Sequence, residues 1–181
     1  MSDSSSQKKE EKIFDSRYKI FEVVGRGASS VVYRAQHVLS ENKEIALKVL
    51  KKGNGKAYNS DLLRHESLAL ITARHKYVIR LEDFRSVDSI CYLAMEYAPN
   101  SNLRNYAEEQ GGKLTPTQAQ RFFVQITEGL AFLHNIGMLH RDLKPDNLLV
   151  INDRQIRLSD FGVATLPGQS TSFEELKKGV G

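Results

Sequence analysis

The 181-residue sequence has no tryptophan, four prolines and a single cysteine, Cys91. One cysteine cannot form a disulfide within the chain, so we expect a reducing compartment, cytoplasmic with the nucleus not excluded. The sequence also lacks any run of about 18 apolar residues, which argues against a membrane-spanning helix. Its N-terminal residues are polar, and Ser2 rather than glycine follows Met1, so we expect neither a secretory signal nor N-myristoylation.

A strong excess of one charge is absent as well, because 26 Lys and Arg face 22 Asp and Glu, giving a net charge of +4. The two signs are mixed along the chain, so the composition gives little support to nucleic-acid binding. Apolar residues make up 40% and charged residues 27% of the chain. These values are typical of a folded globular protein of about one domain and not of a disordered chain.

Segments that favour strands dominate the first half of the chain. Residues 1–17 begin with a polar run and are expected to form a flexible tail. A helix from about Ser60 to Arg74 is expected, with Ser60 at its N-cap and with Leu63, Glu66 and Leu70 on one face. Short segments rich in β-branched and aromatic residues predict strands over 18–24, 31–35, 44–50, 78–84 and 90–97.

The pattern becomes helical beyond Pro99. Thr115 and Gln118 form a capping-box pattern with Pro116 at the first helical position, which predicts the start of a helix. Apolar residues continue at helical spacing, and Gly137 lies just past the expected end. A β-rich half followed by a helical half indicates two lobes that meet near Pro99.

A glycine loop, Gly25-Arg26-Gly27, lies between two expected strands. A dinucleotide-binding fingerprint would need a helix after the glycines, and a Walker loop is excluded because Ala57 follows Gly55-Lys56. Two glycines between strands are most often only a hairpin turn. The alternative is a loop whose backbone N–H groups cover phosphates, where a side chain would obstruct their approach.

Lys48 stands in an otherwise apolar strand, on the same face as Ala46. By itself it would be interpreted as a solvated lysine on an edge strand. Glu66 falls on the apolar face of the expected helix, where an unpaired buried charge is costly. A pair between Lys48 and Glu66 would satisfy both groups and aim the ammonium at a phosphate. The two residues by themselves favour neither this pair nor the solvated lysine.

The most specific feature is the string His140-Arg141-Asp142-Leu143-Lys144-Pro145-Asp146-Asn147, which is followed by Asp160-Phe161-Gly162. With the glycine loop, Lys48 and Glu66 ahead of it in the same order, the sequence resembles the Ser/Thr branch of the eukaryotic-type protein kinase superfamily. The resemblance covers about residues 18 to 181. It implies an α+β, two-lobed kinase fold, with an antiparallel sheet, one helix and a hinge over 18–98 and a partial, mainly helical lobe over 99–181.

The resemblance also implies a Ser/Thr protein kinase that uses ATP and Mg²⁺ and acts on a protein substrate. Transfer of a phosphoryl group depends mainly on positioning and charge stabilisation. Asp142 would accept the proton of the substrate hydroxyl, and Lys144 would offset charge on the γ-phosphate and favour Ser/Thr over Tyr. Lys48, held by Glu66, would bind the α- and β-phosphates.

The same resemblance assigns the remaining ligands. Asn147 and Asp160 would offer oxygen atoms to Mg²⁺. The residues expected around the nucleotide are Val24, Gly25, Arg26, Gly27, Val32, Ala46, Lys48, Met95, Glu96, Ala98 and Asn102. An apolar stack that links the lobes would comprise Leu70, Leu81, His140 and Phe161. Ordinary core packing predicts the same apolar residues, so that alternative stays open.

Two departures from the family pattern matter. Asn102 falls where basophilic members often carry an acidic residue, which weakens the expectation of Arg-directed specificity, although Asp146 could still serve one basic position.

After Asp160-Phe161-Gly162 the family expects an Ala-Pro-Glu element and further helices, and neither is found in this sequence. We therefore expect a C-terminally truncated kinase, with an apolar face of the helix at 116–135 open to a partner. Candidate phosphorylation sites are Thr165, Ser170, Thr171 and Ser172.

A non-catalytic module that binds nucleotide or a partner is the alternative function, and the missing segment motivates it. The intact Asp142, Asn147 and Asp160 argue against it, because a chain without catalysis need not keep them. A nucleic-acid-binding function is a third hypothesis, and only the net charge of +4 supports it.

Overall fold

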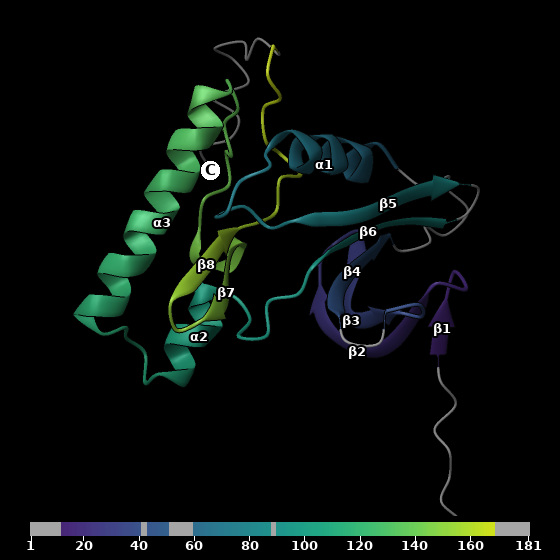
Figure 1. The fold of residues 1–181 in the computed structure, drawn as a ribbon, viewed down its shortest axis with the longest axis horizontal. Helices are drawn as coiled ribbons and strands as arrows, with labels where there is room; N and C mark the ends of the chain where they lie inside the picture. Colours follow the sequence, from purple (N-terminus) through teal and green to yellow (C-terminus); the bar gives the residue numbers. More distant parts are fainter. Residues whose placement is uncertain (1–11, 41–42, 51–59, 88–89, 169–181) are drawn as a thin grey trace, which may run out of the picture.

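The computed structural model describes residues 12–40, 43–50, 60–87 and 90–168. Figure 1 shows a curled antiparallel sheet, with helix α1 (Ser60–Thr72) across it, beside a mainly helical part. In the described residues the sheet has the order β1-β2-β3-β4-β6-β5. Its strands are β1 (Lys12–Phe14), β2 (Tyr18–Arg26), β3 (Ser30–His37), β4 (Glu44–Leu50), β5 (Leu81–Val87) and β6 (Ile90–Glu96).

Helix α1 packs on β5 and β6 and buries Leu63, Glu66 and Leu70, the face that the sequence predicts. It ends at Thr72, two residues earlier than expected. Leu70 and the following Ala73 join a core cluster that also holds Phe161 of the helical part. The end of α1 is therefore fixed against both parts of the molecule, and this places Glu66 beside the cleft between them.

The helical part contains α2 (Leu103–Glu109), α3 (Pro116–Asn135) and a 3₁₀ turn η1 (Pro145–Asn147). Thr115 caps α3 as predicted, because its hydroxyl accepts from the Gln118 N–H at 3.2 Å and Gln118 Oε1 accepts from the Thr115 N–H at 3.1 Å. Gly137 follows the helix with φ of 74°, the left-handed conformation that glycine adopts without strain.

The hairpin of β7 (Leu148–Asn152) and β8 (Gln155–Leu158) packs against α3. Gln125 of α3 ties it in place, since its side chain donates to the Arg154 carbonyl at 2.6 Å and accepts from the Ile156 N–H at 3.0 Å. The hairpin brings the residues before η1 and after β8 together. They carry two motifs of the sequence analysis, His140 to Asn147 and Asp160-Phe161-Gly162.

The prediction of a flexible tail over residues 1–17 is wrong for residues 12–17; residues 1–11 lie outside the described part. Strand β1 pairs with β2, and Phe14 packs edge-on against Tyr92 with ring centroids 5.6 Å apart. Asp15, which is largely buried, accepts hydrogen bonds from Tyr92 and from Arg85 at 3.1 and 3.0 Å. Contacts with distant residues order this segment, and no pattern in its own short sequence predicts a strand.

Three smaller differences concern element boundaries and surface. Strand β2 continues through Gly25 to Arg26, and β5 begins at Leu81 because Val78 forms a single bridge with Leu158 instead. On α3, Phe123 is 67% exposed and the neighbouring Val124 is also exposed, in line with an open apolar surface on this helix. Among the described helices, none combines the length and the apolar character needed to cross a membrane.

Candidate active site

A cleft of about 570 Å³ lies between the sheet and the helical part, and its size is usual for a small-molecule site. All predicted nucleotide-binding residues except Arg26 line it. Arg26 does not line the cleft and is exposed at the end of β2. A larger cavity of about 700 Å³ is lined by the end of α1 and by β5, and its lining includes neither Lys48 nor any of residues 140–147.

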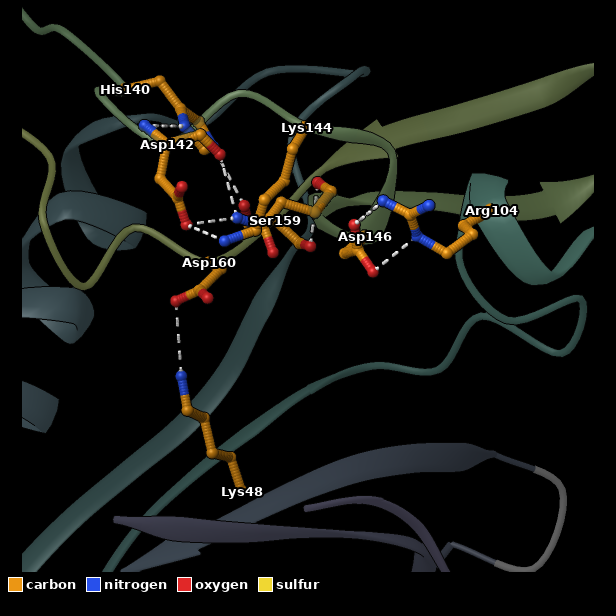
Figure 2. A network of polar contacts seen from close by, with 9 residues as sticks. Lys48, Arg104, His140, Asp142, Lys144, Asp146, Ser159 and Asp160 are labelled. Atoms are coloured by element: carbon orange, nitrogen blue, oxygen red, sulfur yellow. Dashed lines mark hydrogen bonds and ion pairs between the residues drawn. The ribbon is translucent and has the colours of Figure 1, made fainter. Parts of the chain in front are cut away.

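Lys48 and Glu66 form the buried ion pair that the sequence left open. The Lys48 ammonium donates to both carboxylate oxygens of Glu66, at 2.8 and 2.6 Å, and lies 3.6 Å from Asp160 Oδ1. The edge-strand alternative is excluded, because β4 lies between β3 and β6. Figure 2 shows Lys48 reaching from the sheet toward Asp160.

Burial and charge oppose each other in this pair. Burial would lower the pKa of Lys48, but the carboxylates of Glu66 and Asp160 reverse that effect and raise it above its ordinary value. Burial also raises the pKa of Glu66, and Lys48 offsets only part of that rise. Lys48 therefore stays charged and is available to an anionic group in the cleft.

Asp142 is held by two donors in the loop before β7 (Figure 2). Its Oδ2 accepts from the Lys144 ammonium at 2.7 Å and from the Asn147 amide at 2.7 Å. The hydrogen bond from Lys144, followed by that from Asn147, keeps the pKa of Asp142 below its usual value. The carboxylate is thus ionised at neutral pH, and no hydrogen bond to its Oδ1 is found among the described residues.

His140 joins this loop to the segment that carries Asp160. Its Nε2 donates to the Ser159 carbonyl at 2.9 Å, and its Nδ1 accepts from the Asp142 N–H at 3.3 Å, which requires the neutral ring protonated at Nε2. Burial lowers the pKa of His140 and favours this neutral form. The ring packs on Phe161, with centroids 4.9 Å apart, within the predicted stack that includes Leu70 and Leu81.

Ser159 is a residue of this site that the sequence analysis missed. Its hydroxyl and its N–H both donate to the Asn147 carbonyl, at 3.0 and 2.9 Å. Nothing in the local pattern marks this serine, because the contact spans twelve residues. Arg141, which follows His140, and Asp160, which follows Ser159, have φ of 67° and 61°. Backbone conformations of this kind persist where the surroundings fix them, often at functional sites.

Asn147 and Asp160 provide oxygen donors for a cation. The Asn147 amide nitrogen is used by Asp142, which leaves its Oδ1 as an acceptor, and the Asp160 carboxylate is about half exposed in the cleft. The described residues contain no group of three His, Cys, Asp or Glu side chains placed to hold a metal. The two oxygen atoms of Asn147 and Asp160 fit Mg²⁺ by their chemistry, because Mg²⁺ binds through few protein oxygens and keeps water and phosphate ligands.

The segment after Asp160 is anchored at two points. His65 of α1, next to Glu66, contacts the Ala164 carbonyl through Nε2 at 2.7 Å, and the Thr165 N–H donates to the Leu139 carbonyl at 2.8 Å. Thr165 is buried, so as a candidate phosphorylation site it is inaccessible in this arrangement. The other candidates, Ser170, Thr171 and Ser172, lie outside the described residues.

Comparison with known proteins identifies relatives over most of the chain. The family described as protein kinase domain matches residues 18–180. CBL-interacting serine/threonine-protein kinase 18 of Arabidopsis thaliana is 35% identical over 156 residues, which cover 84% of this chain and 29% of the relative. Maternal embryonic leucine zipper kinase of Danio rerio is 34% identical over 161 residues, 88% of this chain and 23% of the relative. The chain thus spans less than a third of the length of these curated relatives.

Proposed function

This chain belongs to the protein kinase family, and we propose that it transfers the γ-phosphate of ATP to Ser or Thr hydroxyls of a protein substrate. Members of the family generally use ATP with Mg²⁺. The observation that carries the proposal is the meeting of Lys48, from the sheet, with Asp160, from the helical part, at 3.6 Å in the cleft. This contact supports the proposal because a bound triphosphate would need both a charged ammonium and a carboxylate that holds its cation.

The cleft would hold the nucleotide between apolar and polar surfaces. Val24, Val32 and Ala46 line it from the sheet, and the segment from Met95 to Ala98 lines it from the connection to the helical part. Gly25 and Gly27 leave room above the cleft for backbone contact with phosphates, since neither carries a side chain. Asn147 and Asp160 would hold Mg²⁺, which neutralises phosphate charge when it is bound.

Asp142 would act as the base for the substrate hydroxyl. Its Oδ2 is engaged by Lys144 and Asn147, so the carboxylate is fixed in orientation with Oδ1 left for the hydroxyl proton. As the hydroxyl oxygen forms its bond to the γ-phosphorus, the bond from that phosphorus to the β–γ bridging oxygen breaks and ADP leaves. Lys144, beside Asp142, offsets charge on the transferred group.

We propose that these groups belong to two lobes, residues 18–98 and residues 99–181. Lys48 and the glycine loop belong to the first lobe, and Asp142, Asn147 and Asp160 to the second. His140 and Ser159 fix the second set as one unit, because their hydrogen bonds join the loop before β7 to the segment after β8. The two sets approach each other where Lys48 lies 3.6 Å from Asp160 in the cleft, beside which the reaction would take place.

The test is transfer of labelled γ-phosphate from Mg·ATP to a mixture of Ser, Thr and Tyr peptides, with the modified residue identified by mass spectrometry. We expect phosphoserine or phosphothreonine from the unmodified protein. Asp160→Asn should reduce transfer at least about 100-fold. Asp153→Asn, an exposed carboxylate in the β7–β8 turn, is the matched control and should leave it unchanged. Binding of Mg·ATP without transfer to any acceptor would contradict the proposal and favour the non-catalytic alternative.

A further inference from the structure

The carboxylates that line the cleft are already paired. In the part of the chain that the structure describes, each lies within 3.6 Å of a cationic nitrogen of the protein. The pairs are Glu22 with Arg34, Glu96 with Arg157, Glu66 and Asp160 with Lys48, and Asp146 with Arg104. The cleft therefore offers no free carboxylate to a basic side chain of a substrate.

Asp146 lines the cleft, and Arg104 from α2 pairs with it (Figure 2). Arg104 Nε donates to Oδ1 at 3.0 Å and a terminal guanidinium nitrogen donates to Oδ2 at 2.9 Å, so both carboxylate oxygens are used. This two-point geometry is the one that a planar guanidinium forms best with a carboxylate. The first turn of α2 presents Arg104, and Asn102 caps that turn by accepting from the Asn105 N–H at 2.9 Å.

Asp146 lies within reach of a substrate that uses Asp142. It precedes Asn147 directly, and the Asn147 amide touches the Asp142 carboxylate at 2.7 Å. Because neighbouring Cα atoms are about 3.8 Å apart, a peptide whose hydroxyl meets Asp142 would pass Asp146 within a few residues of the acceptor. Free of Arg104, this carboxylate would attract an Arg or Lys of the substrate.

We propose that Arg104 is a specificity-determining residue, which occupies Asp146 and so directs the protein to Ser or Thr sites with neutral or acidic neighbours. This inference rests on the proposed kinase function. An incoming substrate arginine would have to displace Arg104 from an equivalent two-point pair, which gives no net gain. Arg104 is 54% exposed and Lys144 about half exposed, and each is paired with a carboxylate, so among the described residues the surface beside the acceptor has no free negative charge that would repel an acidic neighbour.

The test compares peptides that differ only in carrying Arg, Ala or Glu at each of three positions on either side of the acceptor serine. Two quantities are measured for each: kcat/KM, and the affinity of the matching peptide with alanine in place of the serine, by fluorescence polarisation. The unmodified protein should show no gain for Arg over Ala at any position. Arg104→Ala should raise the Arg-to-Ala ratio about threefold to tenfold at one position at least.

Two variants assign such a gain to Asp146. Adding Asp146→Asn to Arg104→Ala should remove it, because the freed carboxylate is then absent. Arg154→Ala removes an exposed arginine from the β7–β8 turn and should leave the ratios as they are. A tenfold preference of the unmodified protein for Arg peptides, or equal ratios with and without Arg104, would overturn the inference. If no peptide is phosphorylated, the kinase function fails, while the affinity ratios still decide the role of Arg104.

Discussion

Replacing Glu66 with leucine is expected to lower the free energy of unfolding by about 3 kcal/mol. Glu66 is 3% exposed and its partner Lys48 is 17% exposed, so the substitution leaves an ammonium largely buried without its carboxylate. Removal of one partner from a buried pair costs about 3–5 kcal/mol. The lower end applies here because Lys48 keeps Asp160 at 3.6 Å.

Lys48→Met leaves the opposite group buried, and a cost of similar size, about 3 kcal/mol, is expected. The double variant Lys48→Met/Glu66→Leu replaces the pair by apolar groups of comparable volume. Neither charge is then buried without its partner, so the double variant should be destabilised less than either single variant. The coupling between the two sites should be about 3 kcal/mol.

Urea denaturation measures these differences. The protein has seven tyrosines and no tryptophan, so far-ultraviolet circular dichroism and tyrosine fluorescence are the suitable signals. Asp160→Asn is the control, because it removes the half-exposed third member of the cluster and should shift stability by less than about 0.5 kcal/mol. If the losses in free energy of unfolding of the two single variants add up to that of the double variant within about 0.5 kcal/mol, the reasoning is refuted, because uncoupled sites behave in that way.

Three other expectations concern His140, helix α3 and His65. Because burial lowers the pKa of His140, the unfolded chain takes up the proton first, so stability should fall as pH drops from about 6.5 toward the folded value; a His140 pKa above 6.5 by NMR would contradict this. Thr115→Ala should cost about 1 kcal/mol through loss of the cap, whereas the exposed Thr117→Ala should cost much less, as thermal unfolding can show. His65→Phe should speed hydrogen exchange at the Thr165 amide about fivefold, and His65→Gln should restore protection; equal exchange in both would exclude an anchoring role for His65.

The features that the sequence predicts correctly are those for which a local rule has one physical outcome. Thr115, Pro116 and Gln118 satisfy the capping rule, and the helix begins there. Glu66 on an apolar face demands a partner, and Lys48 supplies it. The sequence analysis does not predict the hairpin of β7 and β8, although Asn152 and Asp153 separate a continuous apolar run, residues 148–151, from the alternating segment Gln155–Leu158.

Other features depend on contacts that no local pattern carries. Strand β1 has three residues and is ordered by pairing with β2 and by the Asp15 contacts with Arg85 and Tyr92. The Arg104–Asp146 pair joins residues 42 positions apart, so its effect on the cleft is visible only in three dimensions. Arg26 is assigned to the nucleotide by its place in the glycine loop, but it is exposed at the end of β2 and does not line the cleft.

We propose that Asp142 serves transfer of the phosphoryl group and not binding of the nucleotide, which fits its place outside the lining of the cleft. The most direct measurement is single-turnover transfer from Mg·ATP to a Ser peptide by Asp142→Asn, with the Mg·ATP affinity determined on the same sample. We expect transfer to fall at least about 100-fold while the affinity stays within about threefold. Unchanged transfer, or an affinity that falls in parallel with it, would contradict the account.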